Sequence, residues 1–407
     1  MINKEIYEFP ILYTNPIPKI ALGWGAYQTI GDECKAAGMK KALIVTSGLK
    51  GTGILDEVKA IISHAGVATE VYDKITSNPK DHEIMAAYKL FKESQCDGVV
   101  GLGGGSSMDT AKCIRVIDAN GGREVTNFTV FLDPPYAETV SKMKPCVIPQ
   151  VSVATTSGTG AEVTSWAAIS NTKARAKVLV TGPNIHSTVA IVDPLLTRLQ
   201  PRNIAAWTGF DAMAHGIEAF VTKVQGPYGH GLLLRAVELI YKNLRQFTFD
   251  RMNKDACERV TWAATMASIA IGFGNGAGIV HGLGHQISAL TDCHHGRINA
   301  VMMLAGERYN QPTIIDKLAA LTRAMGVDTT GMTEWEAADC WFDEIEQLLK
   351  DLDITPGHIS EQFGVQEKDL EHIIKVYSND FCSQGNPKEF NHDEILALLK
   401  RVMHESY

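Results

Sequence analysis

Short apolar runs alternate with amphipathic helical patterns through the first half of the chain. Between apolar runs at 41–46, 68–75 and 98–102, apolar residues recur at three- and four-residue spacing over 53–65 and 81–95. This strand–helix–strand alternation predicts a parallel sheet covered by helices on both faces. Further strands are expected in the same half, at residues 147–154, 165–170, 177–181 and 188–193.

The pattern changes after Pro194. No convincing strand follows, and apolar residues recur at three- and four-residue spacing in seven stretches. Helices are expected over residues 201–222, 229–247, 255–272, 277–290, 312–325, 333–352 and 367–377. We therefore expect an α/β domain over residues 1–197 and an all-helical domain over residues 198–407. The cleft between two such domains is a common place for a functional site.

Length and composition agree with a two-domain globular protein. The chain has 407 residues, of which 45% are apolar and 21% are charged. The net charge of −8, without any basic run, argues against a nucleic-acid partner. No apolar stretch reaches the ~18 residues of a membrane span. The N-terminus has no signal pattern, and eight cysteines are spread singly, so we expect a cytoplasmic protein with reduced thiols and no membrane partner.

A glycine-rich loop joins the strand at 98–102 to a helical pattern over 107–118. Gly103, Gly104 and Gly105 allow the backbone to approach a ligand closely, and the following helix N-terminus favours a phosphate. Ser106 stands where a full dinucleotide fingerprint has its third glycine, so a tight structural turn stays the alternative.

A polar segment follows the strand at 147–154. Thr155, Thr156 and Thr159 belong to a stretch rich in hydroxyls and glycines, which suits a ribose or adenine but equally a solvated turn. The strand at 41–46 is followed by Ser47 and has no carboxylate at its end, whereas many NAD sites place a carboxylate there that binds the ribose hydroxyls. NADP is therefore open to this chain, and Lys50 favours it.

Carboxylate and imidazole groups cluster in the helical half. Asp211 and His215 are four residues apart and so lie on one helix face, His281 and His285 repeat that spacing, and His295 follows in a histidine-rich segment. One such histidine pair is more often structural than functional. Three clusters without a thiolate favour an open catalytic site for Fe²⁺, Zn²⁺, Mn²⁺ or Co²⁺.

Together these segments resemble the iron-containing (group III) alcohol dehydrogenase family nearly end to end. The motifs that carry the resemblance are Gly103–Lys112, Thr155–Glu162, Gly209–Glu218, and Val280–His285 with His295-Gly296. The resemblance implies a dinucleotide-binding parallel-sheet domain followed by an all-α metal-binding domain, the dehydroquinate synthase-like fold. It also implies metal ligands, which are Asp211, His215, His281 and His295. His285 then lies near the site without being a ligand.

The resemblance also assigns coenzyme-binding positions for NAD or NADP. Those positions are Ser47, Gly104, Gly105, Ser106, Asp109, Thr155, Thr156, Thr159 and Lys177. The chain departs from the family at Ser47, where many NAD-using members carry Asp, and at Trp166, where Asn is common. It departs again at His294 and Arg297, which replace Pro and a small apolar residue.

These observations predict a metal-dependent, NAD(P)-linked alcohol dehydrogenase or aldehyde reductase acting on a short-chain substrate. Fe²⁺ is the expected metal and Zn²⁺ the alternative, with His285 as a candidate proton relay. Arg297 raises the alternative of an anionic aldehyde (a semialdehyde, sulfoacetaldehyde or phosphonoacetaldehyde), unless its guanidinium pairs with a structural carboxylate. A glycerol dehydrogenase or maleylacetate reductase of the same superfamily is a further alternative.

A non-catalytic binding protein with this fold is expected to lose a ligand or the glycine loop, and neither is lost here. We expect a homodimer or a larger homo-oligomer, in which segment 5–25 exchanges strands.

Overall fold

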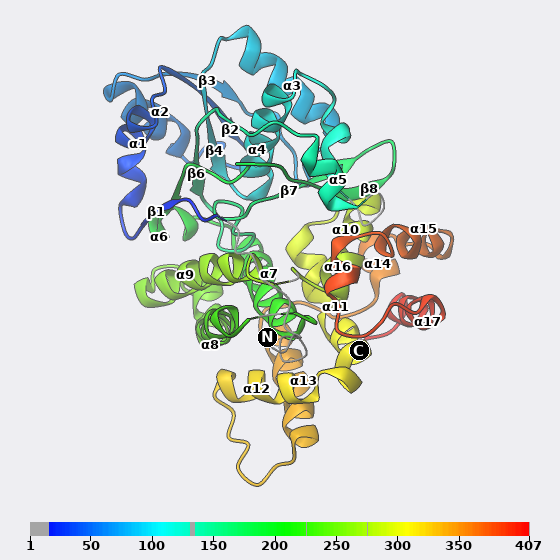
Figure 1. Ribbon diagram of the computed structural model, residues 1–407. Coiled ribbons are helices and arrows are strands. Elements are labelled where there is room, and N and C mark those ends of the chain that lie inside the picture. Colours follow the sequence, from blue (N-terminus) through cyan, green and yellow to red (C-terminus); the bar gives the residue numbers. More distant parts are fainter. Residues whose placement is uncertain (1–15, 131–134, 225, 275, 407) are drawn as a thin grey trace, which may run out of the picture.

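A parallel sheet organises the first half of the protein, drawn at the top of Figure 1. The computed structural model describes residues 16–130, 135–224, 226–274 and 276–406. The six strands run in the order β1-β9-β6-β4-β2-β3, and every neighbouring pair is parallel. Their bounds are β1 (Lys19–Leu22), β2 (Lys41–Thr46), β3 (Ala68–Tyr72), β4 (Gly98–Gly103), β6 (Gln150–Ala154) and β9 (Val189–Val192).

Helices cover both faces of this sheet, as the sequence pattern predicts. On one face, α1 (Ile30–Ala36) and α2 (Ile54–His64) share a core with Ile44 and Leu102. On the other face, α3 (Asp81–Glu93) and α4 (Gly105–Ala119) share a core with Leu43, Val45 and Val99. Alternate residues of each strand face opposite cores, so β4 is buried throughout and β2 is buried from Ala42 to Thr46.

Two of the further strands expected from the sequence belong to a second, smaller sheet. The expected strands at 165–170 and 177–181 do not extend the parallel sheet but form an antiparallel pair, β7 (Ala167–Asn171) and β8 (Ala176–Val180), with β5 (Thr129–Val130) beside them. The connection between β7 and β8 is too short for a parallel crossover, and Arg175 turns it with a φ of 51°.

The N-terminal strand pairs within its own chain. β1 lies beside β9, with Lys19 opposite Val189 and Leu22 opposite Val192. β1 is an edge strand of the sheet, and exchange of segment 5–25 across a dimer stays a prediction. Residues 5–15 of the same segment lie outside the described residues.

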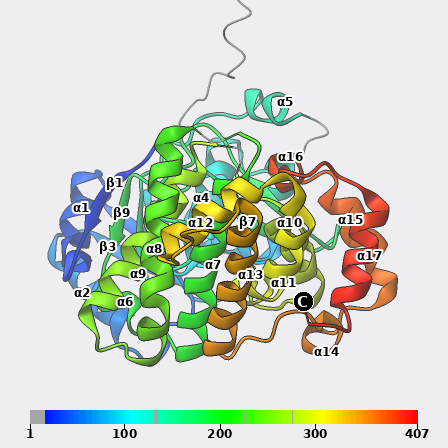
Figure 2. The ribbon, with the colours of Figure 1, turned by 90° about the horizontal axis from the view of Figure 1, so that it is seen from below.

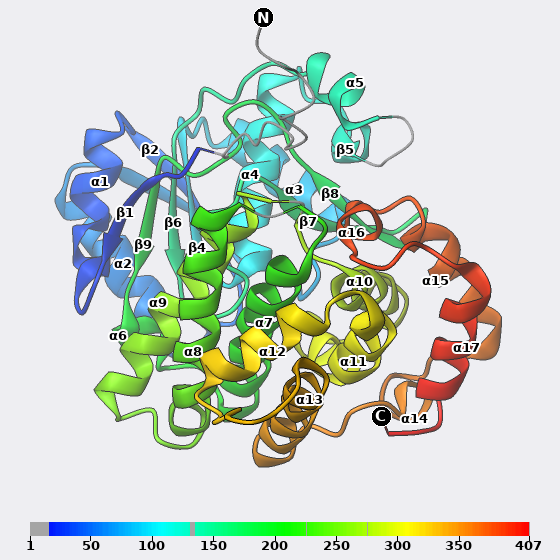
Figure 3. The ribbon, with the colours of Figure 1, turned by 60° about the horizontal axis from the view of Figure 1, so that its bottom comes forward.

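Helices make up the second half, as expected, and Figures 2 and 3 show them packed together beside the sheet. Among the described residues, no helix is both long and apolar enough to cross a membrane. The helices are α6 (Pro194–Thr197), α7 (Arg202–Val221), α8 (Pro227–Phe249), α9 (Lys254–Ile271), α10 (Ile279–Thr291), α11 (His295–Asn310), α12 (Ile315–Met325), α13 (Glu334–Asp351), α14 (Ile359–Phe363), α15 (Glu367–Tyr377), α16 (Phe381–Gly385) and α17 (His392–Val402). The strands end at Val192 and these helices follow, so the predicted fold class is confirmed. The domain boundary at residues 197 and 198 remains a prediction.

The sequence pattern missed α11, one of the central helices of this half. Nearly all of its residues are buried, and the buried residues include the polar Asn299, Glu307 and Asn310, so neither a polar face nor a regular apolar spacing marks this helix in the sequence. Helix α7 is buried in the same way over its last two-thirds. Helices α7, α10 and α11 together carry one aspartate and four histidines predicted for the site, which are Asp211, His215, His281, His285 and His295.

Candidate active site

One cavity of about 860 Å³ lies between the sheet half and the helical half. The segments that follow β2, β4 and β6 line it from one side, and α7, α10 and α11 line it from the other. Fourteen of the fifteen residues predicted to bind coenzyme or metal or to act on the substrate contribute to its wall: Ser47, Gly104, Gly105, Ser106, Asp109, Thr155, Thr156, Thr159, Lys177, Asp211, His215, His281, His285 and His295. Arg297 is the exception.

The glycine-rich loop is packed tightly against the polar segment after β6. A Cβ at Gly105 would lie 2.9 Å from a carbon of Thr159, and a Cβ at Gly104 would lie 3.3 Å from Thr156. Helix α4 begins at Gly105 without a side-chain cap, and Gly105 and Ser106 line the cavity. An uncapped helix N-terminus beside a cavity favours a bound anion such as a pyrophosphate.

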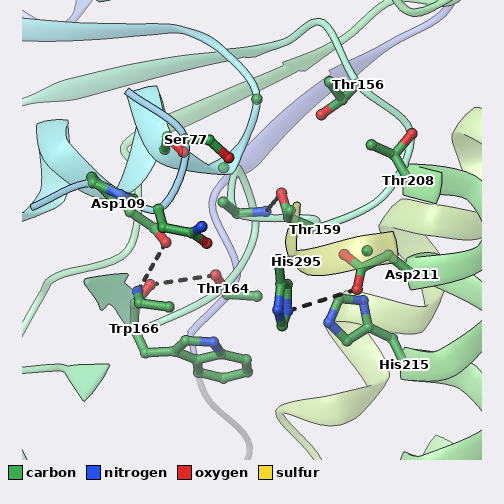
Figure 4. Close-up of a pocket in the computed structure, with 18 of the residues that line it drawn as sticks. Ser77, Asp109, Thr156, Thr159, Thr164, Trp166, Thr208, Asp211, His215 and His295 are labelled. Atoms are coloured by element: carbon green, nitrogen blue, oxygen red, sulfur yellow. Dashed lines mark hydrogen bonds and ion pairs between the residues drawn. The ribbon is translucent and has the colours of Figure 1, made fainter. Parts of the chain in front are cut away.

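Asp109, on α4, forms a buried ion pair beside the cavity. Its carboxylate lies 3.2 Å from the Lys112 ammonium and accepts the Ala168 N–H at 2.9 Å. Lys112 also donates to the Trp166 carbonyl at 2.6 Å. The pair therefore fixes the backbone of Trp166, and Figure 4 shows Trp166 and Asp109 on the side of the pocket opposite Asp211.

Asp211, His281 and His295 bring ligand atoms together from three different helices. The three atoms all lie within 4.8 Å of one another. The Nε2 atoms of His281 and of His295 are each 3.7 Å from Asp211 Oδ1. His215, one turn after Asp211 on α7, stacks on His281 with ring centroids 4.5 Å apart. All four residues predicted as metal ligands thus meet at one end of the cavity.

The imidazoles of this group are neutral and short of hydrogen-bond partners. Burial lowers the pKa of His215 and of His281 to about 4, and lowers the pKa of His295 well below its ordinary value. Among the described residues, His215 Nδ1, His281 Nε2 and His295 Nδ1 are buried without a hydrogen-bond partner. Neutral imidazoles beside one carboxylate are a suitable donor set for a divalent cation, so the residues fit a metal site.

Glu218 orients His281 from behind. Its Oε1 accepts the backbone N–H groups of Gly278 at 2.9 Å and Val280 at 3.0 Å, and its Oε2 bonds to the His281 Nδ1. This bond directs the other ring nitrogen of His281 toward Asp211. Burial raises the pKa of Glu218 to about 7. The sequence offered a signal that was not used, because Glu218 lies seven residues after Asp211 and so on the same face of α7.

Asn299 links two of the candidate ligands. Its amide donates to Asp211 Oδ1 at 2.8 Å and lies 3.2 Å from His295 Nε2. Asn299 is one turn after His295 on α11, a helix that the sequence pattern did not predict, so its position was not foreseen.

His285 borders this group without joining it. Its ring stacks on that of His295 with centroids 5.0 Å apart, and its Nδ1 is 3.8 Å from Asp380 Oδ2. Burial lowers the pKa of His285, although the neighbouring Asp380 opposes the shift. A neutral, cavity-lining imidazole can accept a proton from a ligand.

Lys177 reaches the cavity from β8. Its ammonium donates to Asn78 Oδ1 at 3.1 Å, and the Asn78 amide donates to the Cys293 carbonyl at 3.0 Å. Burial lowers the pKa of Lys177 to about 8, while Asp211 opposes the shift. Asn78 thus connects the coenzyme wall to the segment before His295, a link that spans more than 200 residues of sequence.

Arg297 does not reach the cavity. Its guanidinium donates to Gln362 Oε1 at 2.8 Å and lies 4.8 Å from the centre of the Phe363 ring. The guanidinium also lies 5.5 Å from the centre of the Trp207 ring on α7, so contacts with α14 and α7 hold the side chain. Arg297 is therefore not among the described residues that line the cavity, and its hydrogen-bond partner is an amide where a carboxylate was the expected alternative. This position argues against a contact with an anionic substrate, and the role of Arg297 stays a prediction.

Family models match both halves of the chain. The iron-containing alcohol dehydrogenase model matches residues 17–194, and the model of the C-terminal part of that family matches residues 205–403. Methanol:N,N-dimethyl-4-nitrosoaniline oxidoreductase of Rhodococcus erythropolis is 35% identical, over 99% of each chain. NAD-dependent methanol dehydrogenase of Bacillus methanolicus is 33% identical, over 95% of this chain and 98% of its own.

A solved structure supports the same relationship. The crystal structure of a 1,3-propanediol oxidoreductase superposes with a TM-score of 0.88 at 30% identity, covering 97% of this chain and 100% of that one. The identity extends over both halves and therefore over both walls of the cavity. The chain belongs to the iron-containing alcohol dehydrogenase family.

Proposed function

We propose that this protein transfers hydride between a short, uncharged alcohol and a nicotinamide coenzyme, and that it reduces the corresponding aldehyde in the reverse direction. One observation carries the proposal. A carboxylate and three neutral imidazoles meet at one end of a cavity whose opposite wall is an uncapped, glycine-rich helix N-terminus. The first end suits a divalent cation, and the second suits a dinucleotide.

We assign the metal to Asp211, His215, His281 and His295. A divalent cation bound there supplies Lewis acidity toward the substrate oxygen. Asp211 contributes the negative charge, and the imidazoles keep their lone pairs free because burial disfavours their protonated forms. Fe²⁺ is our first choice for this metal, following the family, and Zn²⁺ is the second.

His285 is our candidate for moving the substrate proton. It lines the same cavity, lies next to His295, and is neutral at ordinary pH. In alcohol oxidation it accepts the hydroxyl proton, and in aldehyde reduction it returns one. Asp380, beside its Nδ1, stabilises the protonated ring.

The coenzyme wall suits NADP as well as NAD. Ser47, which follows β2, lines the cavity, and its Oγ lies 3.2 Å from Ser107 Oγ. A hydroxyl thus stands where a carboxylate would repel a 2′-phosphate. We propose that both coenzymes are accepted. Ser106, Thr155, Thr156, Thr159 and Lys177 are assigned to the remainder of the coenzyme.

The substrate is proposed to be uncharged because no arginine lines the cavity among the described residues. The relatives named above carry methanol and 1,3-propanediol in their names, which agrees with a small alcohol. Among the described lining residues, Lys177 is the one lysine or arginine, and it is assigned to the coenzyme.

The test is a substrate panel with metal-reconstituted protein. Fe²⁺- and Zn²⁺-loaded samples receive methanol, 1,3-propanediol, glycerol and succinic semialdehyde with each coenzyme, and reduced or oxidised nicotinamide is followed by absorbance. Asp211→Asn should abolish turnover, while the exposed control His404→Ala should not. A preference for glycerol would favour the glycerol dehydrogenase alternative. The proposal fails if no alcohol or aldehyde drives coenzyme turnover with either metal.

A further inference from the structure

A second group of metal-ligating side chains lies beside the first. His285 on α10, Asp380 before α16 and Cys382 in its first turn each offer a ligand atom, and the three atoms lie within 4.8 Å of one another. All three residues are buried, with exposed fractions of 6%, 7% and 6%. They share no member with the group around Asp211.

The carboxylate of this group is already held in place. Asp380 Oδ1 accepts the Cys382 N–H at 2.8 Å, and Oδ2 accepts the Gln286 amide at 3.4 Å. Oδ2 is 3.8 Å from His285 Nδ1, which is too long for a hydrogen bond. Nitrogen and oxygen ligands of one tetrahedral zinc ion lie about 3.3–3.6 Å apart. His285 Nδ1 and Asp380 Oδ2 therefore need to approach each other only slightly to bind one cation together.

Charge and access also favour a cation here. One carboxylate, one thiolate and one neutral imidazole balance a divalent ion, so a buried complex carries no net charge. His285 and Cys382 line the large cavity, which gives an ion a route from solvent. A thiolate ligand selects softer ions such as Zn²⁺ over Fe²⁺.

We propose that His285, Asp380 and Cys382 form a second cation site, selective for Zn²⁺ and similar thiophilic ions and adjacent to the first. A cation bound there deprotonates the Cys382 thiol, and the proton leaves to solvent. Cation binding at this second site does not depend on the proposed function. The effect on activity rests on the proposed function: a cation bound to His285 prevents it from transferring the substrate proton, so excess zinc inhibits turnover.

Cobalt titration of metal-free protein under reducing, oxygen-free conditions separates the two sites. Co²⁺ replaces Zn²⁺ in such sites, and a thiolate ligand adds a charge-transfer band in the near ultraviolet. Wild type should bind two equivalents, and the band should accompany one of them. Cys382→Ser should bind one equivalent without the band. The matched control Cys293→Ser, which changes a thiol near the cavity but outside this group, should keep both.

Two further variants make the outcome decisive. Asp380→Asn should lose the band, which covers the case in which Cys382→Ser does not fold. Asp211→Asn should lose the first equivalent and keep the band, whether or not the protein is an alcohol dehydrogenase. Binding of one equivalent by wild type, or a band that survives Cys382→Ser, overturns the proposal. In that case Asp380 serves only as the cap of α16.

Discussion

Replacing Glu218 by Gln tests how much of the metal affinity comes from a residue that touches no metal. The substitution keeps the shape of the side chain and removes its charge. One oxygen of Glu218 accepts backbone N–H groups at the start of α10, and the other bonds to Nδ1 of His281, so both oxygens must act as acceptors. Gln has one acceptor, and its amide group must face either the backbone N–H groups or the ring N–H of His281.

The expected loss follows from these contacts. Removing the partner that orients a ligating histidine costs about 10- to 100-fold in metal affinity, or about 1.4–2.8 kcal/mol. Because His281 is one of four proposed ligands, the site should weaken without disappearing. We expect Glu218→Gln to bind Zn²⁺ or Co²⁺ about 10- to 100-fold more weakly, measured by competition with a chelating dye.

Glu307→Gln is the matched control. Glu307 is buried near Glu218 and accepts a hydrogen bond from Asn310, but it contacts none of the proposed ligands. The dissociation constant for the metal in Glu307→Gln should stay within about twofold of the wild-type value, a smaller change than the loss expected for Glu218→Gln. Equal affinities in wild type and folded Glu218→Gln would refute the reasoning, and so would equal losses in both variants.

The same substitution predicts a pH effect in the metal-free protein. Burial raises the pKa of Glu218 from 4.5 to about 7, so the charged form costs folding free energy. This cost is absent below the unfolded pKa and grows as pH rises from about 4.5 to about 7, where it reaches about 3 kcal/mol. Chemical denaturation of chelator-treated protein should therefore show Glu218→Gln gaining stability relative to wild type across that range. A constant difference across the range would contradict this account.

Three further predictions address the coenzyme, the proton relay and Arg297. Ser47→Asp should raise the kcat/KM ratio of NADH over NADPH at least about tenfold, through repulsion of the 2′-phosphate, and an unchanged ratio would remove Ser47 from coenzyme choice. His285→Asn should lower kcat about 10²-fold or more while keeping one cation at the first site, and a kcat near that of wild type would assign the proton to another group. Arg297→Ala should lower the free energy of unfolding by about 1–2 kcal/mol through loss of its Gln362 and Phe363 contacts. The same variant should leave the ratio of succinic semialdehyde to propanal turnover unchanged, and a falling ratio would restore the anionic substrate.

Local patterns were enough to predict the architecture and most of the site. The alternation of strands and helices predicts the parallel sheet because period and turn chemistry act over a few residues. The glycine-rich loop and the pair Asp211 and His215 are likewise short-range features, and all of them line the one cavity. The resemblance to a family then identified His281 and His295, among the clustered histidines, as the further metal ligands.

Tertiary structure alone decided what surrounds those residues. Glu218 meets His281 across 63 positions, and Asp380 approaches His285 across 95, because separate helices pack face to face. Arg297 is two residues from His295, yet its side chain contacts Gln362 and Phe363 of α14 and does not line the cavity. Side-chain direction depends on the partners that a fold brings near, and no local pattern carries that information. Helix α11 was missed for a related reason: it buries polar residues such as Asn299 and Glu307, whose partners lie elsewhere in the fold, so its sequence shows neither a polar face nor a regular apolar spacing.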